Sequence, residues 1–163
     1  MNIRPAEPRD HAAIRAVVTA AFDETDGREA RIVEAVRAEG RVLVELVAED
    51  AGEIVGHVLF NRMRTPPGRA IAGLGPVGVR PDRQNGGVGD ALCRAGLDAC
   101  RAAAMEAVVV LGHPPYYPRF GFSHAAAANV ISPFADREAF MAMELVPGAL
   151  AAPVKVDYPE AFG

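Results

Sequence analysis

The chain has 163 residues, half of them hydrophobic, with a formal net charge of −4; this length and composition fit a single domain, residues 1–163, with a buried core. The acidic balance and singly scattered arginines exclude a nucleic-acid footprint, and no run reaches the roughly 18 apolar residues of a membrane span. The first residues, Met1–Pro8, are too polar for a signal peptide, so we expect a cytoplasmic protein.

The first part of the chain predicts a short strand followed by two helices. Ile3-Arg4 begins the strand, and Asp10 is a candidate N-cap for an amphipathic helix over 10–22. A polar loop separates it from a second helix at about 28–39, for which Gly40 is a fitting stop.

Strand patterns dominate the middle of the chain. Residues 41–48 are rich in β-branched side chains, and the turn Asp50–Glu53 returns the chain into a strand at 54–63. A further strand is predicted at 70–79. Hairpin connections of this kind give mostly antiparallel pairing.

The second half adds a helix at 87–103 and a buried strand at 106–111, parallel to the 70–79 strand across a helical crossover. Residues 140–145 and 154–158 are predicted as two last strands that form a hairpin. The fold class is therefore mixed α/β (α+β): a mostly antiparallel sheet with a parallel central pair and helices on both faces.

The cysteines and histidines show no sign of a disulfide or a metal site. Cys93 and Cys100 lie seven residues apart on one predicted helix, hence about 10 Å apart, beyond the roughly 7 Å limit for a disulfide. We expect both to be reduced and to belong to the core. No ligand spacing relates the four histidines to one another or to the cysteines, so we expect no metal: His11, His57, His113 and His124.

The most informative segment is the glycine loop between the 70–79 strand and the following helix. It contains Gln84-x-x-Gly87-x-Gly89. Glycines allow a ligand to approach the backbone, and free N–H groups at a helix start attract phosphate. The spacing is neither the Rossmann fingerprint nor a P-loop, which needs a lysine, and the single lysine of the chain is Lys155.

This loop resembles the pyrophosphate loop of the GNAT superfamily, the acetyl-CoA-dependent N-acyltransferases. Two further segments are similar to motifs of that family: the hairpin Ala48–His57 and Tyr117-Pro-Arg-Phe-Gly-Phe122. With the closing Tyr158–Phe162, they resemble the small stand-alone bacterial members. The resemblance covers nearly the whole chain and implies a GNAT-like domain.

The resemblance also implies a site. Acetyl-CoA would be the co-substrate, with its pantetheine arm along Val77, Gly78 and Val79, and with the Val79 N–H polarising the thioester carbonyl. Tyr117 would protonate the departing thiolate as general acid, whereas Tyr116 is expected in the core. The pyrophosphate would lie on the loop residues Gln84, Asn85, Gly86, Gly87, Val88, Gly89 and Asp90.

The chain departs from the family pattern at two places. Asp90 stands where a small or neutral residue is usual, and we expect its side chain to point away from the phosphates. The 70–79 strand lacks the glutamate that often serves as base, which leaves His113, Glu24 or Asp26 as alternatives, or an acceptor that arrives as neutral amine.

The main hypothesis is an N-acetyltransferase that moves an acetyl group from acetyl-CoA to a primary amine of a small molecule or peptide by direct attack in a ternary complex. The missing glutamate keeps open a non-catalytic acyl-CoA-binding or regulatory module. A different α/β nucleotide-binding protein is a third reading, which predicts stronger binding of ATP or NAD than of CoA. A homodimer is implied by the resemblance alone.

Overall fold

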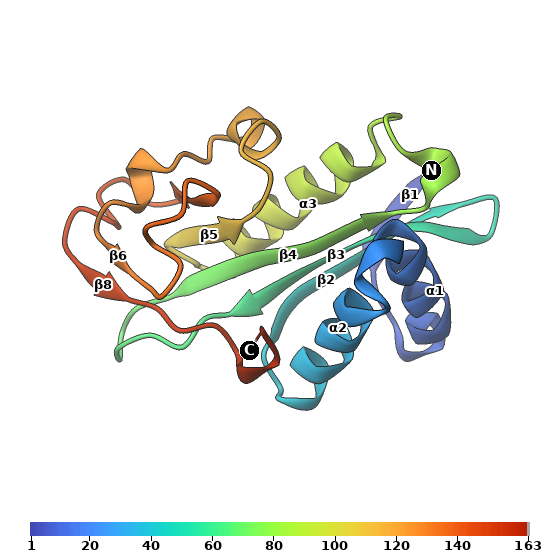
Figure 1. Cartoon of the computed structure of the whole chain (residues 1–163), viewed down its shortest axis with the longest axis horizontal. Helices are drawn as coiled ribbons and strands as arrows, with labels where there is room; N and C mark the ends of the chain where they lie inside the picture. Colours follow the sequence, from blue (N-terminus) through green and yellow to red (C-terminus); the bar gives the residue numbers. More distant parts are fainter. Residues whose placement is uncertain (163) are drawn as a thin grey trace.

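The computed structural model describes residues 1–162 and has one six-stranded sheet with the strand order β1-β2-β3-β4-β5-β7 (Figure 1). Every neighbouring pair in this sheet is antiparallel except β4 and β5, the parallel central pair predicted from the sequence. β6 and β8 form a separate two-stranded parallel sheet. The strands are β1 (Asn2–Pro5), β2 (Val42–Asp50), β3 (Glu53–Arg62), β4 (Ile71–Val79), β5 (Ala107–Leu111), β6 (Val130–Ile131), β7 (Phe140–Glu144) and β8 (Val154–Lys155).

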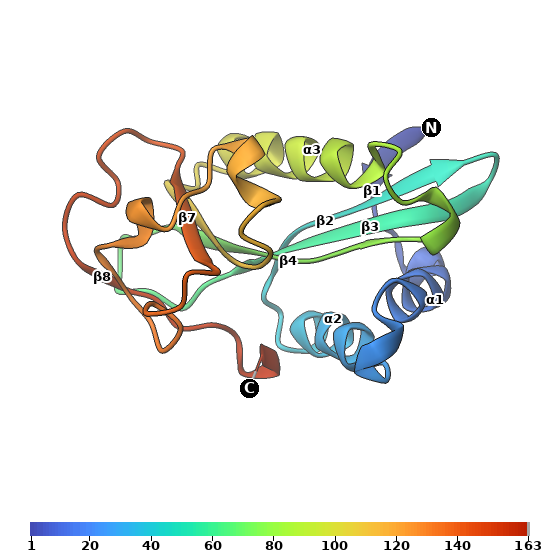
Figure 2. The ribbon, with the colours of Figure 1, turned by 45° about the horizontal axis from the view of Figure 1, so that its top comes forward.

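Three α-helices cover the sheet. α1 (His11–Ala21) and α2 (Arg28–Ala38) pack on one face and α3 (Val88–Ala102) packs on the other (Figure 2). The three predicted helices are thus confirmed to within a residue or two at each end. Short 3₁₀ turns link the elements: η1 (Pro8–Asp10), η2 (Asp23–Thr25), η3 (Pro81–Arg83), η4 (Tyr117–Phe120), η5 (Ala125–Ala127) and η6 (Glu160–Phe162).

The two predicted helix boundaries have different outcomes. Gly40 follows α2 with φ +69°, and the N–H of Arg41 bonds back to the carbonyl of Val36, so the predicted stop is confirmed. Asp10 occupies the N-cap position of α1 but makes no cap bond to it. Its carboxylate instead accepts hydrogen bonds from the Glu7 N–H at 2.8 Å and from the Arg4 guanidinium at 2.8 and 2.9 Å.

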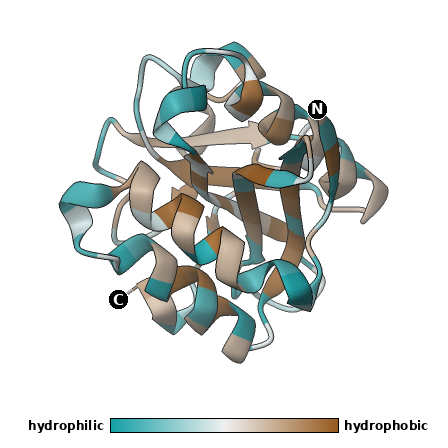
Figure 3. Ribbon diagram, turned by 90° about the vertical axis from the view of Figure 1, so that its right-hand side faces the viewer, coloured by the Kyte–Doolittle hydropathy of each residue, from teal (hydrophilic) through white to brown (hydrophobic). Residues whose placement is uncertain are grey.

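The alternation of side chains along β3 divides the core into two layers. Val58 and Phe60 are fully buried beneath α3, whereas Leu59 is fully buried beneath α1 and α2. Figure 3 shows the hydrophobic stretches of the sheet between helices whose outer surfaces are more polar. Phe60 fills the space beside Gly96 of α3, where an added Cβ would overlap its ring.

The predicted C-terminal hairpin is wrong. β7 pairs with β5, and β8 pairs with β6. The outer edge of β7 is closed by Ser123, which exchanges two backbone hydrogen bonds of 3.0 Å with Ala142. Ser123 thus occupies the middle of the edge at which a returning strand would pair, and the chain continues through residues 145–153 to the smaller sheet.

The two cysteines are free, as expected, and both are completely buried. Burial raises the pKa of the Cys93 and Cys100 thiols to about 12, so both stay protonated and unreactive at neutral pH. Within residues 1–162, no group of three or more side chains is arranged to hold a metal ion. No helix of that part of the chain is long and apolar enough to cross a membrane.

Candidate active site

The site begins where β4 separates from β5. Their pairing ends at Leu74 and Val110. Immediately afterwards β4 carries a bulge, because three steps from Leu74 to Val77 face two steps on β3. A bulge bends the strand that contains it, and beyond it Val77–Val79 is paired with β3 alone.

This separation leaves backbone groups of β4 unpaired on one side. The Arg80 N–H bonds to the Val55 carbonyl of β3 at 2.9 Å. Because successive N–H groups of a strand point to opposite sides, those of Val77 and Val79 point toward the open edge. A chain of amides laid along that edge would find strand-like partners.

A cavity of about 1030 Å³ lies along this edge. It runs from the loop before α3, past β4 and η4, to the region between α2 and the C-terminal turn. All of the predicted site residues except Gly78 and Gly86 line it. The structure therefore brings Val77, Val79, His113 and Tyr117 together with most of the glycine loop.

The two exceptions have clear local reasons. Gly78 is turned toward α1, and a Cβ there would lie 3.5 Å from Val18. Gly86 lies over the 3₁₀ turn η3, with its Cβ position 3.5 Å from the carbonyl oxygen of Arg83. At both positions a Cβ would make ordinary van der Waals contacts with the chain behind the cavity wall.

The glycine loop presents backbone donors at the N-terminus of α3. Gly87 is the N-cap residue with φ +89°, and Asn85 has φ +64°, both in the left-handed region. The first helical bond joins the Ala91 N–H to the Gly87 carbonyl. The N–H groups of Val88 and Gly89 therefore have no acceptor inside the helix, and free N–H groups of this kind are the donors that bind anions at helix N-termini.

The side chain of Gln84 has a structural role in this loop. Its amide Nε2 donates to the carbonyl of Val79 at 3.0 Å. This bond ties the loop to the last residue of β4. It therefore sets the position of the helix N-terminus relative to the open strand edge.

Asp90, in the first turn of α3, does not carry an isolated charge. Its carboxylate accepts the Tyr116 hydroxyl at 2.8 Å and lies 3.4 Å from the Arg119 guanidinium. Tyr116 was expected in the core; it is half-buried and lines the cavity, because this bond holds its hydroxyl at the start of α3. The Arg119 guanidinium also stacks on the Tyr116 ring at 4.2 Å.

The ring of Tyr117 is packed tightly against two neighbouring residues. The ring meets Phe122 edge-on at a centroid distance of 6.0 Å and lies against Gly112, where a Cβ would overlap it. Its hydroxyl has no hydrogen-bond partner among the described side chains and backbone, and the residue lines the cavity. Burial raises the pKa of Tyr117, so the phenol is protonated and can donate at neutral pH.

The three side chains suggested as bases lie in different places. His113 is exposed and lines the cavity, whereas Glu24 and Asp26 are exposed and lie outside its lining. The carboxylate that lines the cavity on this side is Glu29 of α2, with a side chain 17% exposed and 3.0 Å from Arg28. Sequence reasoning missed Glu29, because a helical glutamate beside an arginine is typical of any solvated helix face.

The rest of the cavity wall is formed by aromatic side chains that the sequence did not predict to lie there. Phe22 comes from the end of α1, Phe134 precedes β7, and Tyr158 and Phe162 belong to the C-terminal segment. The segment Tyr158–Phe162 was noticed in the sequence but received no role. No local pattern relates it to Phe134, which lies more than twenty residues earlier in the chain.

Comparison with known proteins places this geometry in a family. The model of the acetyltransferase (GNAT) domain matches residues 2–125. The uncharacterized N-acetyltransferase YhbS of Escherichia coli is 35% identical over 129 residues, which covers 77% of this chain and 75% of that protein. The uncharacterized N-acetyltransferase YjhQ of the same species is 37% identical over 125 residues. The matched region is 72% of this chain and 66% of YjhQ, so this chain spans about two thirds of that protein's length.

Solved structures show the same similarity in three dimensions. A GNAT family acetyltransferase from Brucella melitensis in complex with acetyl-CoA superimposes with a TM-score of 0.83 at 34% identity, covering 99% of this chain and 97% of that one. The Escherichia coli YhbS structure in complex with CoA gives a TM-score of 0.89 at 31% identity, covering 99% and 91%.

Proposed function

The chain belongs to the GNAT acetyltransferase family, and on that premise we propose that it transfers an acetyl group from acetyl-CoA to a primary amine of a small molecule or peptide. The observation that carries the proposal is the continuous cavity that joins the α3 N-terminus, the open edge of β4 and Tyr117. Similar structures hold acetyl-CoA or CoA, which supports the same ligand here.

The phosphate end of the cofactor would bind at the loop Gln84–Asp90. The unpaired N–H groups at the start of α3 donate hydrogen bonds, and the helix dipole adds positive potential. Arg119 neutralises the Asp90 carboxylate nearby, which limits its repulsion of a phosphate. The loop would thus bind phosphate through backbone N–H groups, without a lysine side chain.

The pantetheine arm would run along the open edge of β4, its amides paired with Val77 and Val79. Acetyl-CoA supplies an acyl group already activated as a thioester. The Val79 N–H would polarise the carbonyl and stabilise the oxyanion that forms when the amine attacks. As the carbon–sulfur bond breaks, the Tyr117 hydroxyl would give its proton to the sulfur.

The amine must lose a proton during the transfer. β4 carries no carboxylate between Ile71 and Val79, so the acceptor for that proton would be His113 or Glu29, both in the cavity lining. An amine that binds in its neutral form would need neither. The same missing carboxylate is the observation that favours the alternative function, a non-catalytic acyl-CoA-binding module.

Calorimetric titration with acetyl-CoA, alongside CoA, ATP and NAD, is the experiment that tests the proposal. Binding of acetyl-CoA and CoA without ATP or NAD is the expected result. Release of free thiol in the presence of an amine panel then separates the transferase from the binding module. A folded protein that binds no acetyl-CoA would overturn both functions.

A further inference from the structure

One end of the cavity is built from aromatic rings that the fold gathers from distant parts of the chain. The Phe134 and Tyr158 rings have centroids 5.5 Å apart, and those of Tyr158 and Phe162 are 5.2 Å apart. All three rings line the cavity. The C-terminal turn lies beside α2, away from the loop that precedes α3 (Figure 1 and Figure 2). We call Phe134, Tyr158 and Phe162 the aromatic wall.

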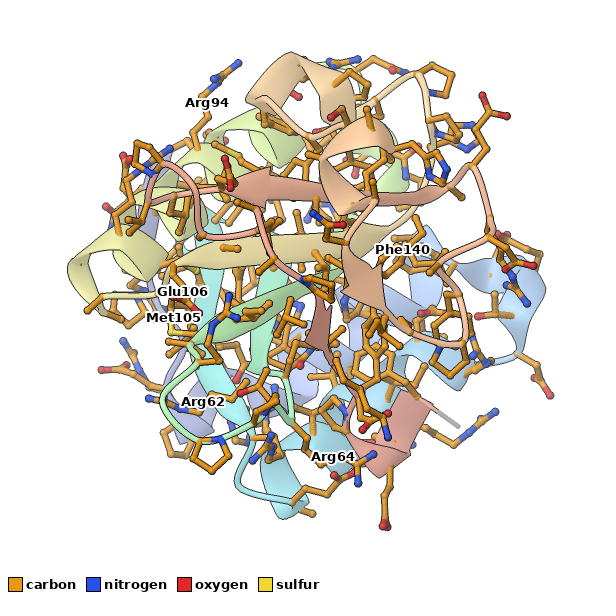
Figure 4. All side chains as sticks on the ribbon, turned by 90° about the vertical axis from the view of Figure 1, so that its left-hand side faces the viewer. Arg62, Arg64, Arg94, Met105, Glu106 and Phe140 are labelled. Carbon is orange, nitrogen blue, oxygen red and sulfur yellow. The ribbon has the colours of Figure 1, made fainter. Side chains whose placement is uncertain are left out.

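The aromatic wall is fixed in place by polar bonds to the main fold. Arg64 and Asp157 exchange two backbone hydrogen bonds of 2.8 and 2.9 Å. The Arg64 guanidinium, which Figure 4 shows beside the C-terminal segment, donates to the Tyr158 carbonyl at 2.6 Å. The carboxylate of Glu39, the C-cap residue of α2, accepts hydrogen bonds from the N–H groups of Glu160 and Ala161 at 3.1 and 2.7 Å. The wall is therefore preorganised before any ligand arrives.

One exposed hydrogen-bond donor beside the wall, the Arg137 guanidinium, has no partner in the part of the chain that the structure describes. The Tyr158 hydroxyl also forms no hydrogen bond within the described chain, but it is closed to solvent and is not offered to a ligand. The Arg137 guanidinium stacks on Phe134, 5.2 Å from the ring centroid, and no carboxylate of residues 1–162 forms an ion pair with it. By contrast, Arg28 across the cavity is paired with Glu29.

This guanidinium and the rings indicate the chemistry of a ligand. A guanidinium suits a carboxylate, which accepts its hydrogen bonds and neutralises its charge. Flat apolar walls suit an aromatic or aliphatic body. A polyamine or a cluster of lysine side chains would instead meet the unpaired positive charge of Arg137.

We infer that the acceptor is a primary amine that carries both an apolar body and a carboxylate, as an apolar α-amino acid does. Its body would pack against the aromatic wall, its carboxylate would bind the Arg137 guanidinium, and its amine would face the β4 edge. This inference rests on the proposed acetyl transfer and names the substrate class for the same site.

Matched acceptor amines test the carboxylate and the apolar body separately. The rate of thiol release is measured with phenylalanine, with phenethylamine, which lacks the carboxylate, with alanine, which lacks the ring, and with spermidine. Phenylalanine should have the highest kcat/KM, about tenfold to a hundredfold above phenethylamine, the range set by hydrogen bonds to a charged group. Equal values for phenylalanine and phenethylamine, or a preference for spermidine, would overturn the inference.

Two variants test the role of Arg137. Arg137→Gln should lower kcat/KM for phenylalanine but leave phenethylamine and the affinity for acetyl-CoA unchanged. Arg101→Gln on α3, an exposed arginine paired with Asp98 outside the cavity, serves as the control. A loss shared equally by both acceptors would count against a carboxylate site.

A binding measurement keeps the inference testable if turnover is absent. N-acetylphenylalanine should bind the CoA-loaded protein more tightly than N-acetylphenethylamine, and Arg137→Gln should remove the difference. Failure of acetyl-CoA to bind the wild-type protein would defeat the proposed function itself. Normal acetyl-CoA binding without this discrimination would defeat the substrate class alone.

Discussion

The hydroxyl of Tyr116 donates a 2.8 Å hydrogen bond to the carboxylate of Asp90, joining the turn η4 to the first turn of α3. This bond links the two functional parts of the cavity, since η4 begins at Tyr117 and α3 begins at the glycine loop. The Tyr116 and Tyr117 rings also meet edge-on at 5.1 Å. Asp90 therefore acts on the proposed proton donor through a neighbouring side chain.

Replacement of Asp90 tests this link. Asp90→Ala should reduce stability by about 0.5–1.5 kcal/mol, the net contribution of a hydrogen bond between partly exposed groups, and should lower kcat more than it raises the Kd of acetyl-CoA. Asp90→Asn keeps an acceptor for the hydroxyl and should be milder in both respects. Thermal unfolding and steady-state kinetics measure the two effects; two variants that match the wild type in kcat would contradict a positioning role.

A side chain at Gly87 should block cofactor binding. A Cβ at Gly87 would contact no atom of the described chain within 4 Å, and Gly87 lines the cavity, so the added side chain would enter it. Gly87→Val should abolish measurable acetyl-CoA binding in calorimetry while the domain stays folded. The φ of +89° adds a strain of about 1–2 kcal/mol for a residue with a side chain.

Gly52 provides the matched control for this substitution. It lies in the β2–β3 turn with φ +80°, and its Cβ position is equally open, but it does not line the cavity. Gly52→Val should carry a similar loss of stability with normal acetyl-CoA affinity. Retained affinity in Gly87→Val would count against the loop as the phosphate site.

Removal of the Tyr117 hydroxyl should slow acetyl transfer without changing the stability of the protein or its affinity for acetyl-CoA. Tyr117→Phe keeps the ring that packs on Phe122 and Gly112, and the hydroxyl has no hydrogen bond to lose within residues 1–162. We expect unchanged unfolding and acetyl-CoA affinity, with kcat lowered about a hundredfold, as for loss of a general acid. A kcat equal to that of the wild type would remove Tyr117 from the mechanism.

The sequence predicted the elements whose signals are local. The helix over 88–102 and the spacing Gln84-x-x-Gly87-x-Gly89 lie within one short segment, where the glycines and the apolar period appear together. The parallel pairing of β4 and β5 followed from a helical crossover, whose geometry leaves few alternatives. These features are sufficient to place the end of the cavity for which cofactor binding is proposed.

The acceptor end depends on contacts between distant segments, which no local pattern records. β8 pairs with β6 because Ser123 closes the edge of β7, a fact visible only in the assembled sheet. Tyr158 reaches the cavity through its bridge to Arg64, nearly a hundred residues earlier. Tyr116 was mistaken for a core residue because its partner, Asp90, lies 26 positions away.

The contact between Phe60 and Gly96 should behave as a coupled pair. Gly96→Ala would force the Phe60 ring aside, and overpacking of a tight core costs about 1–3 kcal/mol. Phe60→Leu alone should also destabilise, because it opens a cavity. The double variant should be more stable than the sum of the two losses predicts, as measured by denaturant unfolding; strict additivity would show that the helix moves instead.

Acid should weaken the attachment of β1 to the start of α1. Hydrogen bonds from Arg4 hold the pKa of Asp10 at about 2, below its usual 3.8, despite the opposing effect of burial. A carboxyl with a depressed folded-state pKa contributes stability above its unfolded pKa and loses it as the pH falls through the folded value. The contribution should therefore be complete above about pH 5 and decline between pH 4 and pH 2. Melting temperatures across this range, compared with Asp10→Asn, measure it: the variant should be less stable at neutral pH and should approach the wild type near pH 2, whereas a constant difference would assign the effect to packing.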